Sequence, residues 1–190
     1  LDMGIERHFN QYVDSMKSLL DKNYDAVFVG TGAPRGRDLK VPGREEAADN
    51  IARGIDWLSS VAFEHIDKIG KKVLVLGGGN TAMDCCRTAR RLGGEDVKVV
   101  VRSPFAEMKA SPWEKDDAIA EDIPIFDNHV PIEFVVKNGK LVGMTFDRVE
   151  AVYDANGKRS LISTGEEPVF MECDDVLLSL IHISEPTRQV

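Results

Sequence analysis

The sequence predicts an α/β fold in which a parallel sheet with helices carries a small antiparallel β-meander. The parallel sheet is indicated by two apolar runs that each end in a glycine turn, DAVFVGTGA at residues 25–33 and KVLVLGGGN at residues 72–80. Near-continuous apolar strands of this kind are typical of parallel sheets that are buried on both faces. The meander is indicated after Ile123, where Asn138-Gly139 and Asn156-Gly157 form two-residue hairpin turns between apolar runs.

Length and composition limit the class of protein. A chain of 190 residues with 43% hydrophobic residues can bury one sizeable core, or one domain and part of another. Its net charge of -8 and pI near 5.1 leave no basic field to attract nucleic acid or anionic lipid. The three cysteines lack the spacing of a disulfide framework, and no apolar run is long enough to span a membrane. We therefore expect a small-molecule enzyme of the reducing cytoplasm, without nucleic-acid or membrane partners.

The segments before the second glycine turn predict two strands and two helices. Residues 4–13 (GIERHFNQYV) are expected to form a strand, and Asp14 to cap a helix that begins near Met16. Residues 25–33 are expected as the next strand. A loop with Pro and Gly then leads to residues 54–66, where apolar side chains recur at helical spacing. The order strand, loop, helix, strand thus leads into the second glycine turn.

The second glycine turn has the pattern G-x-G-x-x-A between a strand and a helix. Its members are Gly77, Gly78, Gly79, Asn80, Thr81 and Ala82. Gly77 permits a tight turn, Gly79 lets a pyrophosphate approach the backbone, and Ala82 lets the helix pack closely on the strand. The helix N-terminus supplies free N–H groups and the positive end of a dipole. The pattern predicts dinucleotide binding, and the alternative is a glycine turn that only packs.

The residues after this turn complete a βαβ unit. Small and apolar residues recur at helical spacing until Gly93-Gly94, which ends the helix. DVKVVVR at residues 96–102 is expected as the second strand, and residues 111–123 as a short helix entered through Ser-Pro. After the meander, residues 166–178 are expected to return as the last strand of the parallel set.

The end of the second strand carries a basic residue instead of an acidic one. In dinucleotide folds, a carboxylate about 20 residues after the turn binds the ribose 2′-hydroxyl. Here Arg102 ends the strand, and Lys109 follows a few residues later. This favours a 2′-phosphate and therefore NADPH. The alternative is that Arg102 is a solvated charge.

Three segments together resemble a known family. They are YDAVFVGTGAPRGRDLKVPGREE, GKKVLVLGGGNTAMDCCRTARRLG and the VR…AEMKASPWE segment. Over residues 4–177 the chain is similar to the small subunit of NADPH-dependent glutamate synthase and its relatives, which bind FAD and NAD(P) in two nested dinucleotide domains. The resemblance implies that NADPH docks on the glycine turn and passes a hydride to FAD, whose electrons leave singly through iron–sulfur clusters. Many relatives carry two consecutive arginines where this chain has Arg102-Ser103.

The resemblance also implies a first cofactor contact and a division into domains. The turn formed by Gly30, Thr31, Gly32 and Ala33 matches the family's second glycine motif, which lies near the FAD. We expect a partial FAD-binding domain at residues 1–45, a connecting helix at 46–66, the NADPH-binding domain at 67–177 and a tail at 178–190. The part that grips the FAD pyrophosphate and the cysteine-rich iron–sulfur region would lie upstream, so the chain is expected to be an inactive fragment.

The end of the chain has an unusual sequence. LSLIHISEPTR, at residues 178–188, resembles the translation of a transposon-type sequencing adapter. The expectation is a tail foreign to the fold, and the alternative is an ordinary polar tail.

The sequence does not identify the final electron acceptor. Related subunits serve ferredoxin–NADP transhydrogenases, formate dehydrogenases or hydrogenases, each with an electron-accepting partner. A non-catalytic NAD(P)-binding module is a further alternative. Cys85 and Cys86 are neighbours in a helix with side chains about 100° apart, so we interpret them as buried small residues and expect no dithiol relay. No side chain suggests an acid, base or nucleophile, and no metal site is expected.

Overall fold

The computed structural model describes residues 3–22, 24–30, 36, 38–156 and 159–180. The chain forms two compact units, Leu1–Gly32 and Ala33–Val190.

In its described residues, the first unit contains one short helix. Helix α1 spans Met16–Leu20, as expected, but its cap is Ser15, whose Oγ accepts a hydrogen bond from the N–H of Lys17 at 3.2 Å. In the described residues of 4–13 and 25–33 the structure has no strand, so the two strands expected there are wrong. A strand needs a neighbour for its N–H and C=O groups. The apolar pattern is present here without a sheet, and Phe28 is 95% exposed.

The second unit is built on a five-stranded parallel sheet in the order β1-β9-β2-β3-β4. Its strands are β1 (Ile51–Arg53), β2 (Lys72–Leu76), β3 (Asp96–Val100), β4 (Ile125–Phe126) and β9 (Asp175–Leu178). Every neighbouring pair is parallel. From Val73 to Leu76 the central strand β2 is at most 4% exposed, because both faces of the sheet are covered. The expected α/β class, a parallel sheet with helices, is confirmed, and its arrangement is Rossmann-like.

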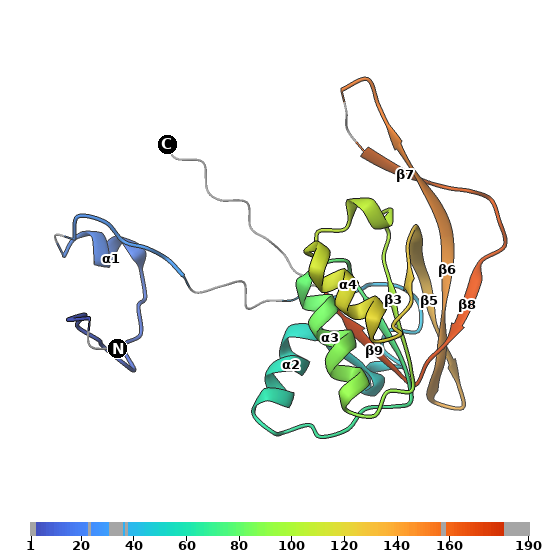
Figure 1. Cartoon of the computed structure of the whole chain (residues 1–190), viewed down its shortest axis with the longest axis horizontal. Helices are drawn as coiled ribbons and strands as arrows, with labels where there is room; N and C mark the ends of the chain where they lie inside the picture. The colour runs from blue at the N-terminus through green and yellow to red at the C-terminus, as the bar shows by residue number, and fades with distance from the viewer. Residues whose placement is uncertain (1–2, 23, 31–35, 37, 157–158, 181–190) are drawn as a thin grey trace. The chain divides into compact units, whose positions relative to one another are not determined.

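Three helices cover one face of this sheet (Figure 1). They are α2 (Gly54–Ala62), α3 (Asn80–Arg91) and α4 (Pro112–Ala120), with short 3₁₀ helices η1 (Ala48–Asn50) and η2 (Phe105–Glu107) in the loops. Their inward side chains share a core with β2 and β3. The helix expected at residues 54–66 ends at Ala62. Strand β1 precedes it and was not expected, since three residues ending in an arginine give no apolar run.

An antiparallel sheet covers the opposite face, as Figure 1 shows. It consists of β5 (His129–Lys137), β6 (Lys140–Tyr153), β7 (Arg159–Ser163) and β8 (Val169–Glu172), with β6 paired to the other three. Met144 and Phe146 of β6 are fully buried and pack in one cluster with residues of the parallel strands. Asn138 and Gly139 have φ of 52° and 73°, the positive values that a tight hairpin turn requires. The expected meander and its first turn are therefore confirmed, whereas Gly157 of the second expected turn lies outside the described residues.

The single strand expected at residues 166–178 is in fact two strands. Strand β8 pairs antiparallel with β6, and β9 then enters the parallel sheet. Between them, the N–H of Cys173 donates to the carbonyl of Val142, and the N–H of Asp174 donates to that of Lys72. The chain thus changes sheets within two residues. An apolar pattern alone does not show such a change, because both strands are buried on at least one face.

Leu178, the first residue of the expected tail, lies in the last strand of the parallel sheet. Leu178 ends β9, is 1% exposed and pairs with both Leu76 and Arg53. The N–H of Ser179 donates to the carbonyl of Leu76 at 2.9 Å. These two residues therefore belong to the sheet. Residues 181–190, which carry most of the expected tail, lie outside the described part of the chain.

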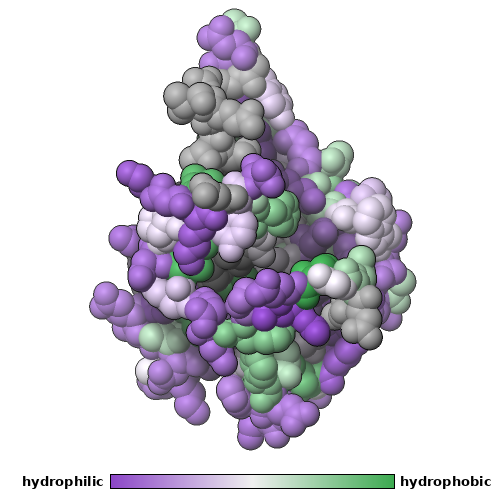
Figure 2. All heavy atoms as spheres, turned by 90° about the vertical axis from the view of Figure 1, so that its left-hand side faces the viewer, coloured by the Kyte–Doolittle hydropathy of each residue, from purple (hydrophilic) through white to green (hydrophobic). Residues whose placement is uncertain are grey.

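Hydrophilic residues make up most of the face drawn in Figure 2, with hydrophobic residues between them. Within the described part of the chain, no helix has the length and apolar character needed to cross a membrane.

Candidate dinucleotide site

The glycine turn joins the end of β2 to the start of α3, at the carboxyl edge of the parallel sheet. Gly77 has φ of 144°, in a region that favours glycine, and its N–H donates to the carbonyl of Val100 at 3.1 Å. A Cβ at this position would lie 2.5 Å from the carbonyl oxygen of Ser179. Gly77 is therefore required for both its conformation and its close approach to the chain that follows β9.

The two glycines after it differ in their surroundings. A Cβ on Gly78 would meet Val101 Cγ1 at 3.2 Å, so this residue is packed against the chain after β3. Around Gly79, in contrast, no heavy atom of another described residue lies within 4 Å of an added Cβ, apart from its two chain neighbours. Gly79 is the N-cap of α3, and its carbonyl accepts a hydrogen bond from Ala82 at 2.9 Å. The structure thus leaves open space at the helix N-terminus, where a phosphate can approach the backbone.

The first residues of α3 have two roles: Asn80 connects the start of the helix to α4, and Ala82 packs in the core. The side chain of Asn80 donates to Ser111 Oγ at 3.3 Å and accepts from the N–H of Ser111 at 2.8 Å, which ties the start of α3 to the start of α4. Thr81 is half-buried, and Ala82 is fully buried in the core. The first N–H groups of a helix have no partner inside it. Those of Asn80 and Thr81 donate to no other described residue.

The chain after β3 forms a wall beside the turn. Val101, Met108 and Ala110 are buried, and the N–H of Ala110 donates to the carbonyl of Gly78 at 2.9 Å. Arg102 directly follows Val101, and Lys109 lies between the other two wall residues. The structure therefore brings both predicted basic residues beside the glycine turn. Both side chains are exposed, and neither makes a hydrogen bond or ion pair with another described residue. Their binding of a phosphate stays a prediction.

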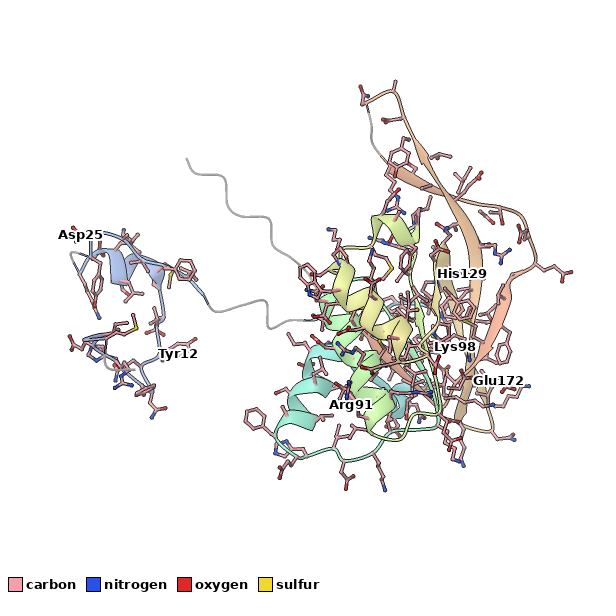
Figure 3. All side chains as sticks on the ribbon, in the orientation of Figure 1. Tyr12, Asp25, Arg91, Lys98, His129 and Glu172 are labelled. Carbon is pink, nitrogen blue, oxygen red and sulfur yellow. The ribbon has the colours of Figure 1, made fainter. Side chains whose placement is uncertain are left out.

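The loop that carries Arg102 is held by the start of the meander. The N–H of Phe105 donates to Asp127 Oδ2 at 2.8 Å, and the N–H of Asn128 donates to the carbonyl of Ser103 at 3.4 Å. His129, labelled in Figure 3, is 6% exposed, and its N–H donates to the carbonyl of Val101 at 3.0 Å. Sequence reasoning missed these contacts. The polar Asp-Asn pair directly after an apolar run was the only signal.

An ion-pair cluster fixes α4, which begins beside the turn, against α3. Arg87 of α3 contacts Glu114 at 3.3 Å, Asp117 at 3.0 Å and Glu121 at 2.9 Å, and Arg91 contacts Glu121 at 2.7 Å. Figure 3 labels Arg91 on the helical side of the sheet. Burial raises the pKa of Glu121, but the hydrogen bonds from Arg87 and Arg91 outweigh it, so the pKa of this carboxyl is lowered.

The three cysteines are buried and unpaired. Burial raises the pKa of the Cys85 thiol, and it raises the pKa of the Cys86 thiol to about 12. Both are 0% exposed, which confirms that they pack as small core residues. A thiol that stays protonated is a poor nucleophile and metal ligand. Within the described residues, no group of His, Cys, Asp and Glu is arranged to hold a metal ion.

The first glycine turn is only partly described. Gly30 is exposed, and the ring of Phe28 lies 3.0 Å from an ideal Cβ on it. The other predicted members, Thr31, Gly32 and Ala33, lie outside the described residues. The expected contact of this turn with FAD therefore stays a prediction, as do the expected domain boundaries.

Comparison with known proteins gives consistent matches. Residues 5–179 match the family of pyridine nucleotide-disulphide oxidoreductases. The chain is 33% identical over 167 residues to the NADP(+)-dependent formate dehydrogenase subunit beta of Moorella thermoacetica, covering 87% of this chain and 24% of that protein. It is 33% identical over 174 residues to the glutamate synthase [NADPH] small chain of Azospirillum brasilense, covering 84% and 36%. The chain thus spans about a quarter to a third of these relatives.

A solved structure shows the same fold. FprA from Mycobacterium tuberculosis, in complex with NADPH, superimposes with a TM-score of 0.65 at 20% identity, covering 90% of this chain and 53% of that one.

The parallel sheet, its helices and the glycine turn define a dinucleotide-binding domain of the Rossmann type. The chain belongs to the pyridine nucleotide-disulphide oxidoreductase family, whose members are NAD(P)H-dependent flavin oxidoreductases. The resemblance to the glutamate synthase small subunit is confirmed.

Proposed function

We propose that the turn from Gly77 to Ala82 binds NADPH in an enzyme that passes its hydride to FAD. One observation carries this proposal: an open helix N-terminus at Gly79 lies beside two exposed basic side chains, Arg102 and Lys109, that have no partner among the described residues. The helix end suits the pyrophosphate. The two cations suit the additional phosphate that distinguishes NADPH from NADH.

The residues present fit this cofactor. The backbone N–H groups of Asn80 and Thr81 are available to phosphate oxygens, and the missing Cβ of Gly79 leaves room for them. A guanidinium such as that of Arg102 can bind a phosphate through two parallel hydrogen bonds. The bound nicotinamide would supply the hydride chemistry, and the protein orients it. No acid or base from this chain is needed for that transfer.

The second half of the proposal concerns FAD and the electron acceptor. FAD would bind in a second Rossmann-like domain, to which the first unit and Gly30 belong. Electrons would then pass through iron–sulfur clusters to a partner subunit or domain in the cytoplasm. The similarity to a glutamate synthase small chain and to a formate dehydrogenase subunit beta supports this arrangement. A formate dehydrogenase is therefore the second candidate for the complex that this protein serves.

The test is a titration of the purified chain with NADPH and NADH, followed by nicotinamide fluorescence. Arg102→Ala should weaken NADPH binding by about ten- to a hundredfold, the value of a hydrogen bond to a charged group. NADH binding should change little, because NADH lacks the 2′-phosphate. Arg148→Ala is the matched control, since Arg148 pairs with Glu166 on the meander. Equal losses for both cofactors would remove the case for NADPH, and unchanged NADPH binding would show Arg102 to be a solvated charge.

A further inference from the structure

The hairpin formed by β6 and β7 extends beyond the rest of the antiparallel sheet, toward the loop between β3 and α4 (Figure 1). At its far end, Tyr153 of β6 and Arg159 of β7 are a cross-strand pair. Such pairs place their side chains on the same face of a sheet. Both side chains contact Glu107 of η2, which lies in the loop between Arg102 and Lys109.

These two side chains occupy both oxygens of the Glu107 carboxylate. The hydroxyl of Tyr153 donates to Oε1 at 2.6 Å, and Arg159 Nη1 lies 3.3 Å from Oε2. Arg159 also donates from Nη2 to the carbonyl oxygen of Arg102 at 3.4 Å. One guanidinium therefore contacts both the backbone of Arg102 and the Glu107 carboxylate of the same loop.

Glu107 lies close in sequence to both basic residues of the proposed phosphate site. It lies five residues after Arg102 and two before Lys109. A carboxylate free to turn toward either cation would compete with an incoming phosphate and reduce the positive potential at the site. Bound by Tyr153 and Arg159, Glu107 leaves both cations unpaired among the described residues.

The guanidinium of Arg159 is also incompletely satisfied. Its Nε is buried and has no hydrogen-bond partner among the described residues, while the side chain as a whole is 29% exposed. A buried donor without a partner costs stability. This Nε therefore adds no hydrogen bond to the hairpin, whereas the other two nitrogens contact Glu107 and the backbone of Arg102.

We propose that Arg159, assisted by Tyr153, is a positioning residue for cofactor selection: it holds Glu107 away from Arg102 and Lys109 and so keeps them available for the 2′-phosphate of NADPH. This inference rests on the proposed binding of NADPH at the glycine turn. The end of the β6–β7 hairpin would then act on cofactor binding through Glu107, without touching the reacting atoms.

The experiment is a set of titrations of the whole chain with NADPH and NADH. Arg159→Gln should weaken NADPH binding by about two- to thirtyfold, the range over which residues without ligand contact change binding. NADH binding should stay nearly constant. Tyr153→Phe should act in the same direction, with a smaller loss. Arg148→Gln is the matched control, because it breaks another arginine–glutamate pair of the meander.

The double variant Arg159→Gln/Glu107→Gln separates positioning from a merely structural role. Removing the competing carboxylate should restore most of the lost NADPH affinity, a positive coupling between the two sites. A hairpin that had only lost stability would not be rescued, and thermal melting of each variant shows whether it folds. Equal losses for both cofactors, or no rescue, would overturn the inference.

The outcomes also separate the two proposals. Wild-type preference for NADPH that persists unchanged in Arg159→Gln overturns the role of Arg159 alone. A wild-type chain that does not distinguish NADPH from NADH overturns it together with the proposed cofactor preference.

Discussion

The α-carbon of Gly77 faces the carbonyl oxygen of Ser179 so closely that a Cβ would lie 2.5 Å from it. This contact joins the glycine turn to the residue that follows β9. The same residue, Ser179, donates its N–H to Leu76, the last residue of β2. The conformation of the turn therefore depends on its contact with Ser179 as well as on its own glycines, and its stability depends on the end of β9.

Gly77→Ala should destabilise the second unit as a whole. Its φ of 144° is strained for any residue with a Cβ, and the backbone of Ser179 cannot move away cheaply. We expect the free energy of unfolding to fall by about 1–3 kcal/mol, measured by urea unfolding. Both NADPH and NADH affinities should fall with it. A variant as stable as the wild type would contradict the contact.

Gly79→Val should lower both cofactor affinities as well, but without a large loss of stability. The backbone here has φ of -105°, which valine adopts, and among the described residues an added Cβ meets no atom within 4 Å apart from its chain neighbours. Stability should change by no more than about 1 kcal/mol, the scale of a helix cap. The side chain would fill the space expected for the pyrophosphate, so both cofactors should lose affinity equally. Retained binding in a folded variant would show that the phosphates lie elsewhere.

Truncation separates the end of the sheet from the tail. Removing residues 181–190 should leave unfolding and cofactor titrations unchanged, as expected for a tail foreign to the fold. Removing residues 178–190 also deletes Leu178, which is 1% exposed. That loss should cost about 2–5 kcal/mol, as for other buried leucines. Calorimetry of the two chains compares them directly, and equal melting temperatures would place the boundary at Leu178 after all.

The sequence was sufficient to predict the features that short-range patterns determine. The run KVLVL and its glycines predicted β2, the turn and α3, because the conformation at Gly77 is one that few other residues adopt. Strand β1 was missed, since Ile51–Arg53 is stabilised by pairing with β9, about 125 residues later. The contact of Arg159 with Glu107 depends on how far the hairpin reaches. No local pattern encodes such a long-range contact.

The Glu121 carboxyl should make the free energy of unfolding depend on pH in the acid range. Its pKa is lowered in the folded chain, because the hydrogen bonds from Arg87 and Arg91 outweigh the opposing effect of burial. A lowered folded pKa adds stability that is fully present above the unfolded value, about 4.3, and is lost as pH falls through the folded value. Glu121→Gln should therefore cost about 1 kcal/mol at neutral pH and reduce the dependence of unfolding free energy on pH below about 4.5.

Urea unfolding at a series of pH values measures this change, with Arg87→Gln as the background that tests its cause. In that background Glu121 has lost one of its two arginine partners, so the further change to Gln should have a smaller effect at neutral pH. Below about pH 4.5, Glu121→Gln should also change the slope of unfolding free energy against pH less in the Arg87→Gln chain than in the wild-type chain. An undiminished effect of Glu121→Gln in the Arg87→Gln chain would mean that Arg87 does not stabilise the ionised carboxylate, and that Arg91 is the partner that does.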